Sequence, residues 1–299
     1  MLLLSVVYDQ QRIDIAEEIS ELKSFLVSKN VTIDVKKSFL DNTHFLKIYC
    51  DDNEFSDRLL KTFNIYIANI IYNIVIDEFY KKEMQLFLAD TYFFLKYDEI
   101  DEIRELSLKA LKSDKALSAD ELVYCINKKN TIIDKIIECI EENKEINIKG
   151  FITFRMKELR EDLENIIDKV VETYMVEKEY NEFIKLLKYF VDIQESKIEE
   201  INILIKQDGS YLVQDSNGED ILSKITSELS EARFTSTVSI EDMLISGLIT
   251  NAPQRIIVHC SDNCLNKELI DTVQNVFTDR VSFCDSCKAC KSIKHSIKV

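Results

Sequence analysis

The sequence is poor in the residues that interrupt regular structure. It contains four glycines, one proline and no tryptophan, and neither glycine nor proline occurs before Gly150. A stretch of that length without either residue is expected to be mainly helix joined by short polar turns. The scarcity also excludes glycine-rich phosphate loops, because neither GxGxxG nor GxxxxGK[ST] occurs.

Histidine is also scarce, with only His44, His259 and His295. A catalytic site of the Ser-His-Asp or Cys-His type can draw on these three alone, and no GxSxG motif accompanies them. The acidic runs 51–54 and 98–105 lack the spacing of an HExxH or EF-hand metal site. We therefore interpret both runs as solvated surface.

Positive charge is in the minority: 38 Lys and Arg stand against 54 Asp and Glu, a formal net charge of -16. Such a chain is poorly suited to general binding of nucleic acid or anionic membranes. With 46% hydrophobic and 31% charged residues, the composition is that of a globular protein.

Two apolar segments bear on the location of the protein. The N-terminal "MLLLSVVYDQQR" has no basic region and no cleavage site, so it predicts a strand and not a signal peptide. The run Asn64–Ile76 is too short to span a bilayer and holds three asparagines, so it predicts a buried helix. We expect a cytoplasmic protein without a membrane span, whose eight cysteines stay reduced unless they bind metal or do redox work.

The hydrophobic pattern predicts a mainly helical α+β fold in three parts. Residues 1–52 predict a β-α-β-β unit, because alternating segments flank a helical pattern. Residues 53–197 predict a helical domain, including a capping box at Ser118–Glu121 and a long helix from Lys149 to Val191. Residues 198–299 predict an α/β module.

The predicted C-terminal module contains a β-α-β crossover. It begins with a hairpin turning at Asp208-Gly209. Two helices follow at about 219–231 and 239–250, and then a strand at 255–259, a helix at 265–277 and a strand at 280–283.

Several sequence blocks resemble a known family. "KGFITFR", "ISGLITNAPQRIIVHC" and "ELIDTVQNVFTDRVSFCDSC" resemble the YtxC-like sporulation proteins of endospore-forming bacteria. The resemblance covers essentially the whole chain and is densest from Ile146 to Cys287. It implies a role in sporulation, but no activity comes with it, and no catalytic residue can be transferred.

Five cysteines gather near the end of the chain. They form C-x3-C, nineteen residues, and then C-x2-C-x2-C: Cys260, Cys264, Cys284, Cys287 and Cys290. A crossover makes the two flanking strands parallel if they share a sheet, so both strands end at the same edge. The two cysteine groups are therefore expected to converge.

The convergence leaves several kinds of site open. Four thiolates suit a zinc ion, and C-x2-C-x2-C is also part of a ferredoxin-type run for an iron–sulfur cluster. Either His259 or His295 can replace a cysteine, although strand alternation points His259 away from its neighbours. Thiol redox chemistry and plain packed thiols are the alternatives. Cys50, Cys125 and Cys139 lie in apolar patterns and are expected to be core thiols.

Two basic clusters stand out against the acidic chain. Four cations lie where the long helix begins: Lys149, Arg155, Lys157 and Arg160. Because the helix dipole disfavours positive charge at this end, we expect an anion to compensate them. The anion is either the chain's own carboxylates or an external phosphate or acidic partner, with Arg155 as the favoured contact. The last twelve residues carry four lysines and no acid, and we interpret them as a solvated tail.

These observations favour a non-enzymatic, sporulation-associated protein that acts through contacts with a protein partner and has a C-terminal structural metal site. Two alternatives remain open. One is a metal- or thiol-dependent enzyme at the strand ends near Cys260 and Cys284, since open α/β sheets place sites there. The other is nucleic-acid or acidic-partner binding through Arg155 and the lysine tail.

Overall fold

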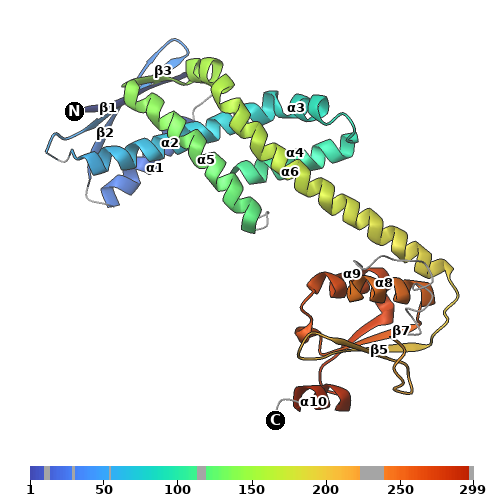
Figure 1. Cartoon of the computed structure of the whole chain (residues 1–299). Coiled ribbons are helices and arrows are strands. Elements are labelled where there is room, and N and C mark those ends of the chain that lie inside the picture. Colours follow the sequence, from blue (N-terminus) through green and yellow to red (C-terminus); the bar gives the residue numbers. More distant parts are fainter. Residues whose placement is uncertain (10–13, 29–30, 54, 113–118, 223–238, 296–299) are drawn as a thin grey trace. The chain divides into compact units, whose positions relative to one another are not determined.

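A computed structural model describes residues 1–9, 14–28, 31–53, 55–112, 119–222 and 239–295. The chain divides into two compact units, Met1–Met175 and Val176–Val299 (Figure 1). Residues 1–52 and the helices that follow share one hydrophobic core. The division into three domains near residues 52 and 197 stays a prediction.

Unit 1 contains a four-stranded sheet in the order β2-β3-β1-β4. Its strands are β1 (Leu2–Asp9), β2 (Ile33–Leu40), β3 (Thr43–Cys50) and β4 (Glu145–Asn147), and α1 (Asp14–Ser28) follows β1. The β2–β3 turn has Asp41 at φ 51°, a left-handed conformation that Asp tolerates better than most residues. The predicted β-α-β-β unit is confirmed, and β4 is an addition that joins the sheet parallel to β1.

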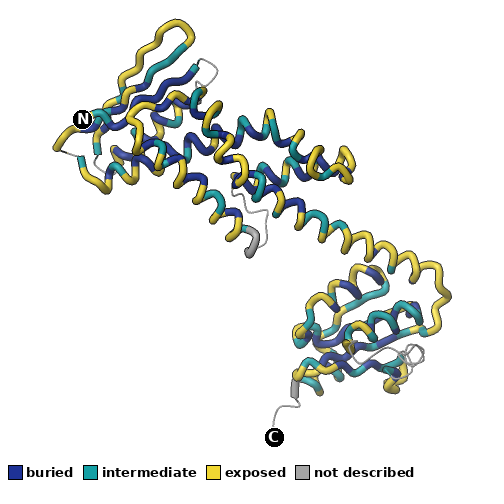
Figure 2. Tube along the Cα trace, turned by 45° about the horizontal axis from the view of Figure 1, so that its top comes forward, coloured by how far each residue is buried: buried dark blue, intermediate teal, exposed yellow. Residues whose placement is uncertain are grey.

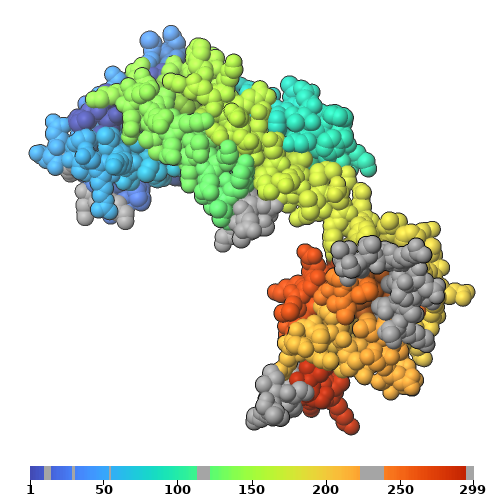
Figure 3. Space-filling model, viewed as in Figure 1, coloured from blue at the N-terminus to red at the C-terminus, as the bar shows by residue number. Residues whose placement is uncertain are grey.

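The described part of unit 1 contains five further helices, and the last one continues into unit 2. They are α2 (Asp57–Lys82), α3 (Met84–Thr91), α4 (Tyr97–Lys112), α5 (Ala119–Glu142) and α6 (Ile148–Ile193). The predicted long helix is α6, and one of its faces is buried through Met156, Leu159, Leu163, Ile166 and Val170. The side chains of α5 (green) and of the first part of α6 (yellow-green) meet on the surface of unit 1 (Figure 3). The capping residue predicted at Ser118 lies outside the described residues.

The predicted buried helix at Asn64–Ile76 lies within α2. Among the described helices, α2 alone is long and apolar enough to cross a membrane, and 61% of its most apolar window is buried. Phe63, Tyr72 and Phe79 are fully enclosed, and the Tyr72 hydroxyl donates to the carbonyl of Leu111 at 2.8 Å. These contacts are those of a helix at the centre of a packed core.

Unit 2 contains a second four-stranded sheet, in the order β6-β5-β7-β8. Its strands are β5 (Glu200–Ile205), β6 (Tyr211–Gln214), β7 (Arg255–His259) and β8 (Val281–Cys284), and its helices are α8 (Ile240–Asn251), α9 (Lys267–Phe277) and α10 (Lys288–His295). Strands β5, β7 and β8 are parallel, which confirms the predicted crossover through α9. The predicted helix at 219–231 lies largely outside the described residues.

The two faces of this sheet have different coverings. Alternate residues of β5 and β7, among them Ile203 and Val258, pack with α8 and α9 into the core of unit 2. Helix α10 lies on the opposite side of the sheet from α8 and α9 (Figure 1). In Figure 2 much of β5 and β7 is dark blue, because these two central strands hold most of the buried residues of the sheet.

A buried ion pair joins α5 to α6 in unit 1. Asp162 is 7% exposed and accepts hydrogen bonds from Lys135 at 2.5 Å and Lys128 at 3.3 Å. Burial raises the pKa of Asp162, but the two lysines outweigh it, so its pKa lies below the ordinary value. The carboxylate therefore contributes stability above the pKa of an unfolded Asp, and this contribution is lost as the pH falls through the lowered pKa.

We predict that Asp162→Asn lowers the free energy of unfolding by about 1–3 kcal/mol at neutral pH, because two lysines lose their charged acceptor. Denaturant unfolding followed by circular dichroism measures the loss. The difference from wild type should shrink as the pH falls below about 4. Glu172→Gln is the control, because its pair with Lys169 is on the surface, and it should have little effect. An equal loss in both variants would contradict the prediction.

Candidate metal centre

The site begins where two parallel strands end together. β7 ends at His259 and β8 at Cys284, and these two residues are paired in the sheet register. Since paired residues of neighbouring strands point to the same face, both side chains lie on the face away from α8 and α9. The next amide, that of Cys260, donates to the carbonyl of Cys284 at 3.1 Å and holds the two chain ends together.

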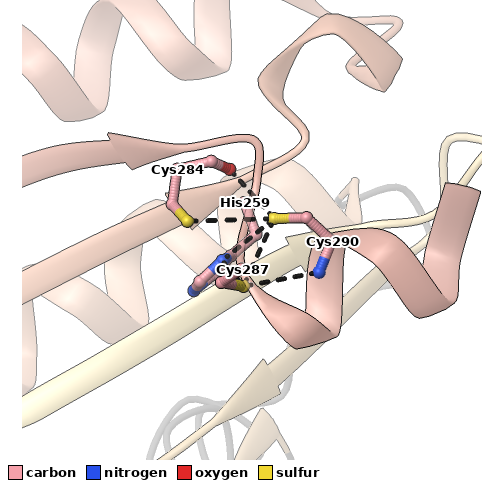
Figure 4. A group of neighbouring side chains, drawn as sticks. All are labelled: His259, Cys284, Cys287 and Cys290. Carbon is pink, nitrogen blue, oxygen red and sulfur yellow. Dashed lines mark hydrogen bonds between the residues drawn. The ribbon is translucent and has the colours of Figure 1, made fainter.

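Two further cysteines arrive from the turn into α10. Cys287 precedes the helix and Cys290 lies in its first turn, so a single turn of chain places both next to Cys284. Figure 4 shows the three sulfurs and the His259 ring turned toward one another. One ligand atom from each of His259, Cys284, Cys287 and Cys290 lies within 4.8 Å of the other three.

The separations within this group match those around a single metal ion. The Cys287 and Cys290 sulfurs are 3.5 Å apart, and those of Cys290 and Cys284 are 3.9 Å apart. His259 Nδ1 lies 3.4 Å from the sulfurs of both Cys287 and Cys290. With Zn–S of about 2.3 Å and Zn–N of about 2.0 Å, a tetrahedral site needs ligand separations of roughly 3.5–3.8 Å.

A hydrogen bond orients the histidine for coordination. His259 Nε2 lies 3.0 Å from Oδ1 of Asn202 on β5. The Asn202 amide nitrogen donates to Glu200 Oε1 at 3.1 Å and to the carbonyl of Asp215 at 3.5 Å, so Oδ1 is its atom facing the ring. His259 therefore carries its proton on Nε2, and the lone pair of Nδ1 points at the sulfurs. Metal-binding histidines are held in this way by acceptors behind the ring.

The protonation states differ across the group. Burial lowers the pKa of His259, which favours the neutral ring that binds metals. The backbone N–H of Cys290 lies 3.4 Å from the Cys287 sulfur and is the main cause of a lowered pKa for that thiol. Burial raises the pKa of Cys290 to about 12, and neighbouring thiols add to this. Without a metal, the Cys290 thiol keeps its proton and donates to the carbonyl of Cys284 at 3.1 Å.

Comparison with known proteins places the chain in a family. Residues 65–282 match the sequence profile of the YtxC-like family. The chain belongs to the YtxC-like family. It is 26% identical over 206 residues to "Uncharacterized protein YtxC" of Bacillus subtilis (strain 168), an alignment that covers 67% of this chain and 69% of that protein. No solved structure matches it.

The family resemblance that we inferred from the sequence blocks is thus confirmed for this YtxC-like protein. The matched region includes His259 and ends at residue 282, before the three cysteines of the group. Family membership therefore carries no argument for the metal centre, which depends on the geometry of the residues themselves.

The structure brings together three of the five predicted cysteines. Cys284, Cys287 and Cys290 join His259. Cys260 is buried, and it is among the neighbouring thiols that raise the pKa of Cys290. Cys264 belongs instead to the core on the α9 side of the sheet. It donates to the carbonyl of Asn266 at 3.0 Å and lies 3.6 Å from the Tyr211 hydroxyl.

Cys264 also differs from its predicted place at a helix start. The helix α9 begins at Lys267, three residues later, with Asn266 as its N-cap. The other predicted histidine ligand, His295, ends α10, and its side chain lies outside the described residues.

Two of the four cations in the basic cluster of this YtxC-like chain pair with its own carboxylates. Arg155 binds Glu158 at 2.9 Å, and Arg160 binds Glu164 at 2.6 Å and Glu83 at 3.4 Å. The other two cations of the cluster, Lys149 and Lys157, are exposed. Binding of an external anion here stays a prediction. The lysine tail falls partly outside the described residues, which include the side chains of Lys288 and Lys291.

We predict that Asn202→Ala weakens zinc binding by about 10–100-fold, because the ring of His259 loses the acceptor that fixes its tautomer. Asn202→Asp should retain most of the affinity, since its carboxylate accepts the same hydrogen bond. Competition with a chromophoric chelator measures both. Asn263→Ala is the control, because this side chain bonds the carbonyl of Ile205 at the same end of the sheet. Equal affinity in the Ala and Asp variants would contradict the role assigned to Asn202.

Proposed function

We propose that this protein is a cytoplasmic, non-enzymatic participant in sporulation that acts through protein contacts and carries a structural Cys3His zinc centre. The observation that carries the metal assignment is the convergence of four ligand atoms within 4.8 Å from three separate segments. The hydrogen bond that His259 Nε2 donates to Oδ1 of Asn202 supports it, because it leaves Nδ1 of His259 as the coordinating nitrogen that faces the sulfurs.

The ligand set favours zinc over the other candidate groups. Cys3His is a standard structural zinc set, and four protein ligands close the coordination sphere, whereas catalytic zinc keeps a position for water or substrate. An iron–sulfur cluster requires room for several irons and sulfides between its cysteines. The separations of 3.5 and 3.9 Å between sulfurs suit a single ion instead.

A zinc ion here would have a mechanical role. It would link α10 to the ends of β7 and β8, because its ligands are His259 on β7, Cys284 on β8, and Cys287 and Cys290 at the start of α10. Metal binding of this kind contributes directly to folding stability, because the unfolded chain has no preformed site. The C-terminal segment would then be held in one conformation, available for contact with a partner.

Exposed aromatic side chains support the proposal that the protein acts through contacts with a protein partner. Phe93 is 83% exposed and its ring lies 6.0 Å from that of Phe94, which is 56% exposed. Large apolar side chains grouped on a surface mark interaction sites. The net charge of -16 does not suit general nucleic-acid binding. The link with sporulation comes from the family resemblance.

We predict that the protein purified without chelator, or reconstituted with zinc under reducing conditions, contains a single zinc ion per chain. The variant Cys287→Ser with Cys290→Ser should contain none, because half of the ligands are removed. Cys264→Ser and Cys139→Ser are matched controls, since both remove a thiol outside the group, and both should keep the ion. Plasma emission spectrometry measures the metal, and circular dichroism checks the fold. Wild-type protein that stays metal-free after reconstitution would contradict the proposal.

The sporulation role predicts a separate result in cells. Deleting the gene in an endospore-forming host should lower the yield of heat-resistant spores, and the wild-type gene should restore it. A copy carrying Cys287→Ser with Cys290→Ser should restore less, if the centre stabilises the segment that contacts the partner. The Cys264→Ser copy should restore the wild-type yield. An unchanged spore yield in the deletion strain would contradict the sporulation role and leave the metal assignment standing.

A further inference from the structure

The C-terminal part of α6 exposes an apolar surface that the described residues of unit 2 leave uncovered. Over residues 176–193, six large apolar side chains are between 42% and 63% exposed: Val176, Phe183, Leu186, Tyr189, Phe190 and Ile193. Monomeric proteins seldom expose contiguous apolar patches above a few hundred Å². We call this set the α6 stripe.

The α6 stripe follows the spacing of a coiled-coil contact. Val176, Phe183 and Phe190 recur at seven-residue steps, and Leu186 and Ile193 each lie three residues beyond one of them, as in the a and d positions of a heptad. A neighbouring face of the same segment is buried in the core of unit 2 through Ile184 and Val191. This part of the helix therefore has a second apolar face with heptad spacing.

The area of the stripe is close to that of a protein–protein contact. Large side chains each offer on the order of 200 Å², so the exposed fractions correspond to roughly 600 Å² for each copy of the chain. A standard interface buries about 800 Å² on each partner. Pairing of two such stripes would give an association of modest strength.

The charges along this segment favour antiparallel pairing. Its first half, 176–182, has three glutamates and one lysine, and its second half, 183–193, has two lysines and one aspartate. A parallel pair would set Glu179, at a d position, against its own copy, and like charges facing each other are destabilising. An antiparallel pair sets each acidic half against the half with more lysines.

We propose that the α6 stripe is a self-association surface on which a second copy of this chain packs its own α6 stripe in the antiparallel sense. The heptad spacing, the exposed area and the charge distribution all support a second copy of the chain as the partner of the stripe. The inference does not depend on the metal centre, which uses other residues of unit 2.

Sedimentation velocity of the full chain across the micromolar range tests the association. The wild type should show a concentration-dependent monomer–dimer equilibrium. Phe183→Glu with Leu186→Glu should weaken dimerisation at least about tenfold, because each change buries a carboxylate in an apolar contact. Asn181→Glu is the matched control, since it adds a negative charge on a face of the helix away from the stripe, and it should dimerise almost normally. A wild type that stays monomeric throughout would overturn the proposal.

Photocrosslinking identifies what contacts the stripe. Ile193 is replaced by benzoylphenylalanine, and labelled and unlabelled copies are mixed so that mass spectrometry distinguishes crosslinks between copies. Antiparallel pairing predicts crosslinks to the region around Val176 of the second copy. Crosslinks to the region around position 193 of the second copy would overturn the antiparallel arrangement. Crosslinks within one chain, for example to residues 223–238, would show that the chain covers its own stripe and would overturn self-association.

Discussion

The parallel pairing of β7 with β8 is the constraint on which the cysteine-rich end depends. It sets His259 opposite Cys284 although 24 residues separate them in sequence. The turn after β8 then returns along the same edge, so that Cys287 and Cys290 need no long-range contact of their own. A change in register by one residue would move every side chain of β8 to the other face. The clustering of His259 with the three cysteines is thus a consequence of strand register more than of cysteine spacing.

Much of this could be predicted from the sequence, because the crossover was visible in its hydrophobic pattern. Alternating segments around an amphipathic helix indicated parallel strands, and parallel strands end at one edge. The prediction favoured Cys260 and discounted His259 because alternation turns the histidine away from its neighbours. That alternation was real, but α10 covers the face to which His259 turns. The sequence pattern of a helix as short as α10 does not indicate which face of the sheet the helix will cover.

Other features escaped prediction for a different reason. β4 has only three residues, too few to show a period of two, and its place in the sheet comes from pairing with β1. Cys264 was expected at a helix start, but Asn266 caps α9 and the thiol turns into the core beside Tyr211. The cationic cluster was visible in the sequence, and its acidic partners Glu158 and Glu164 lie one turn away on the same helix. Local pairing of this kind can be anticipated from sequence spacing, whereas the pairing with Glu83 cannot.

The small strand β4 has a consequence for how the protein is made. β1 lies inside the finished sheet between β3 and β4, but its parallel partner is more than 130 residues away in the chain. During synthesis β1 and β3 can pair early, while the other edge of β1 stays open until β4 emerges. Its side chains are almost all buried in the finished fold, and an open edge of that kind attracts other strands. The nascent chain is therefore most vulnerable to aggregation while α2 to α5 are being synthesised, and this period ends only when β4 pairs with β1.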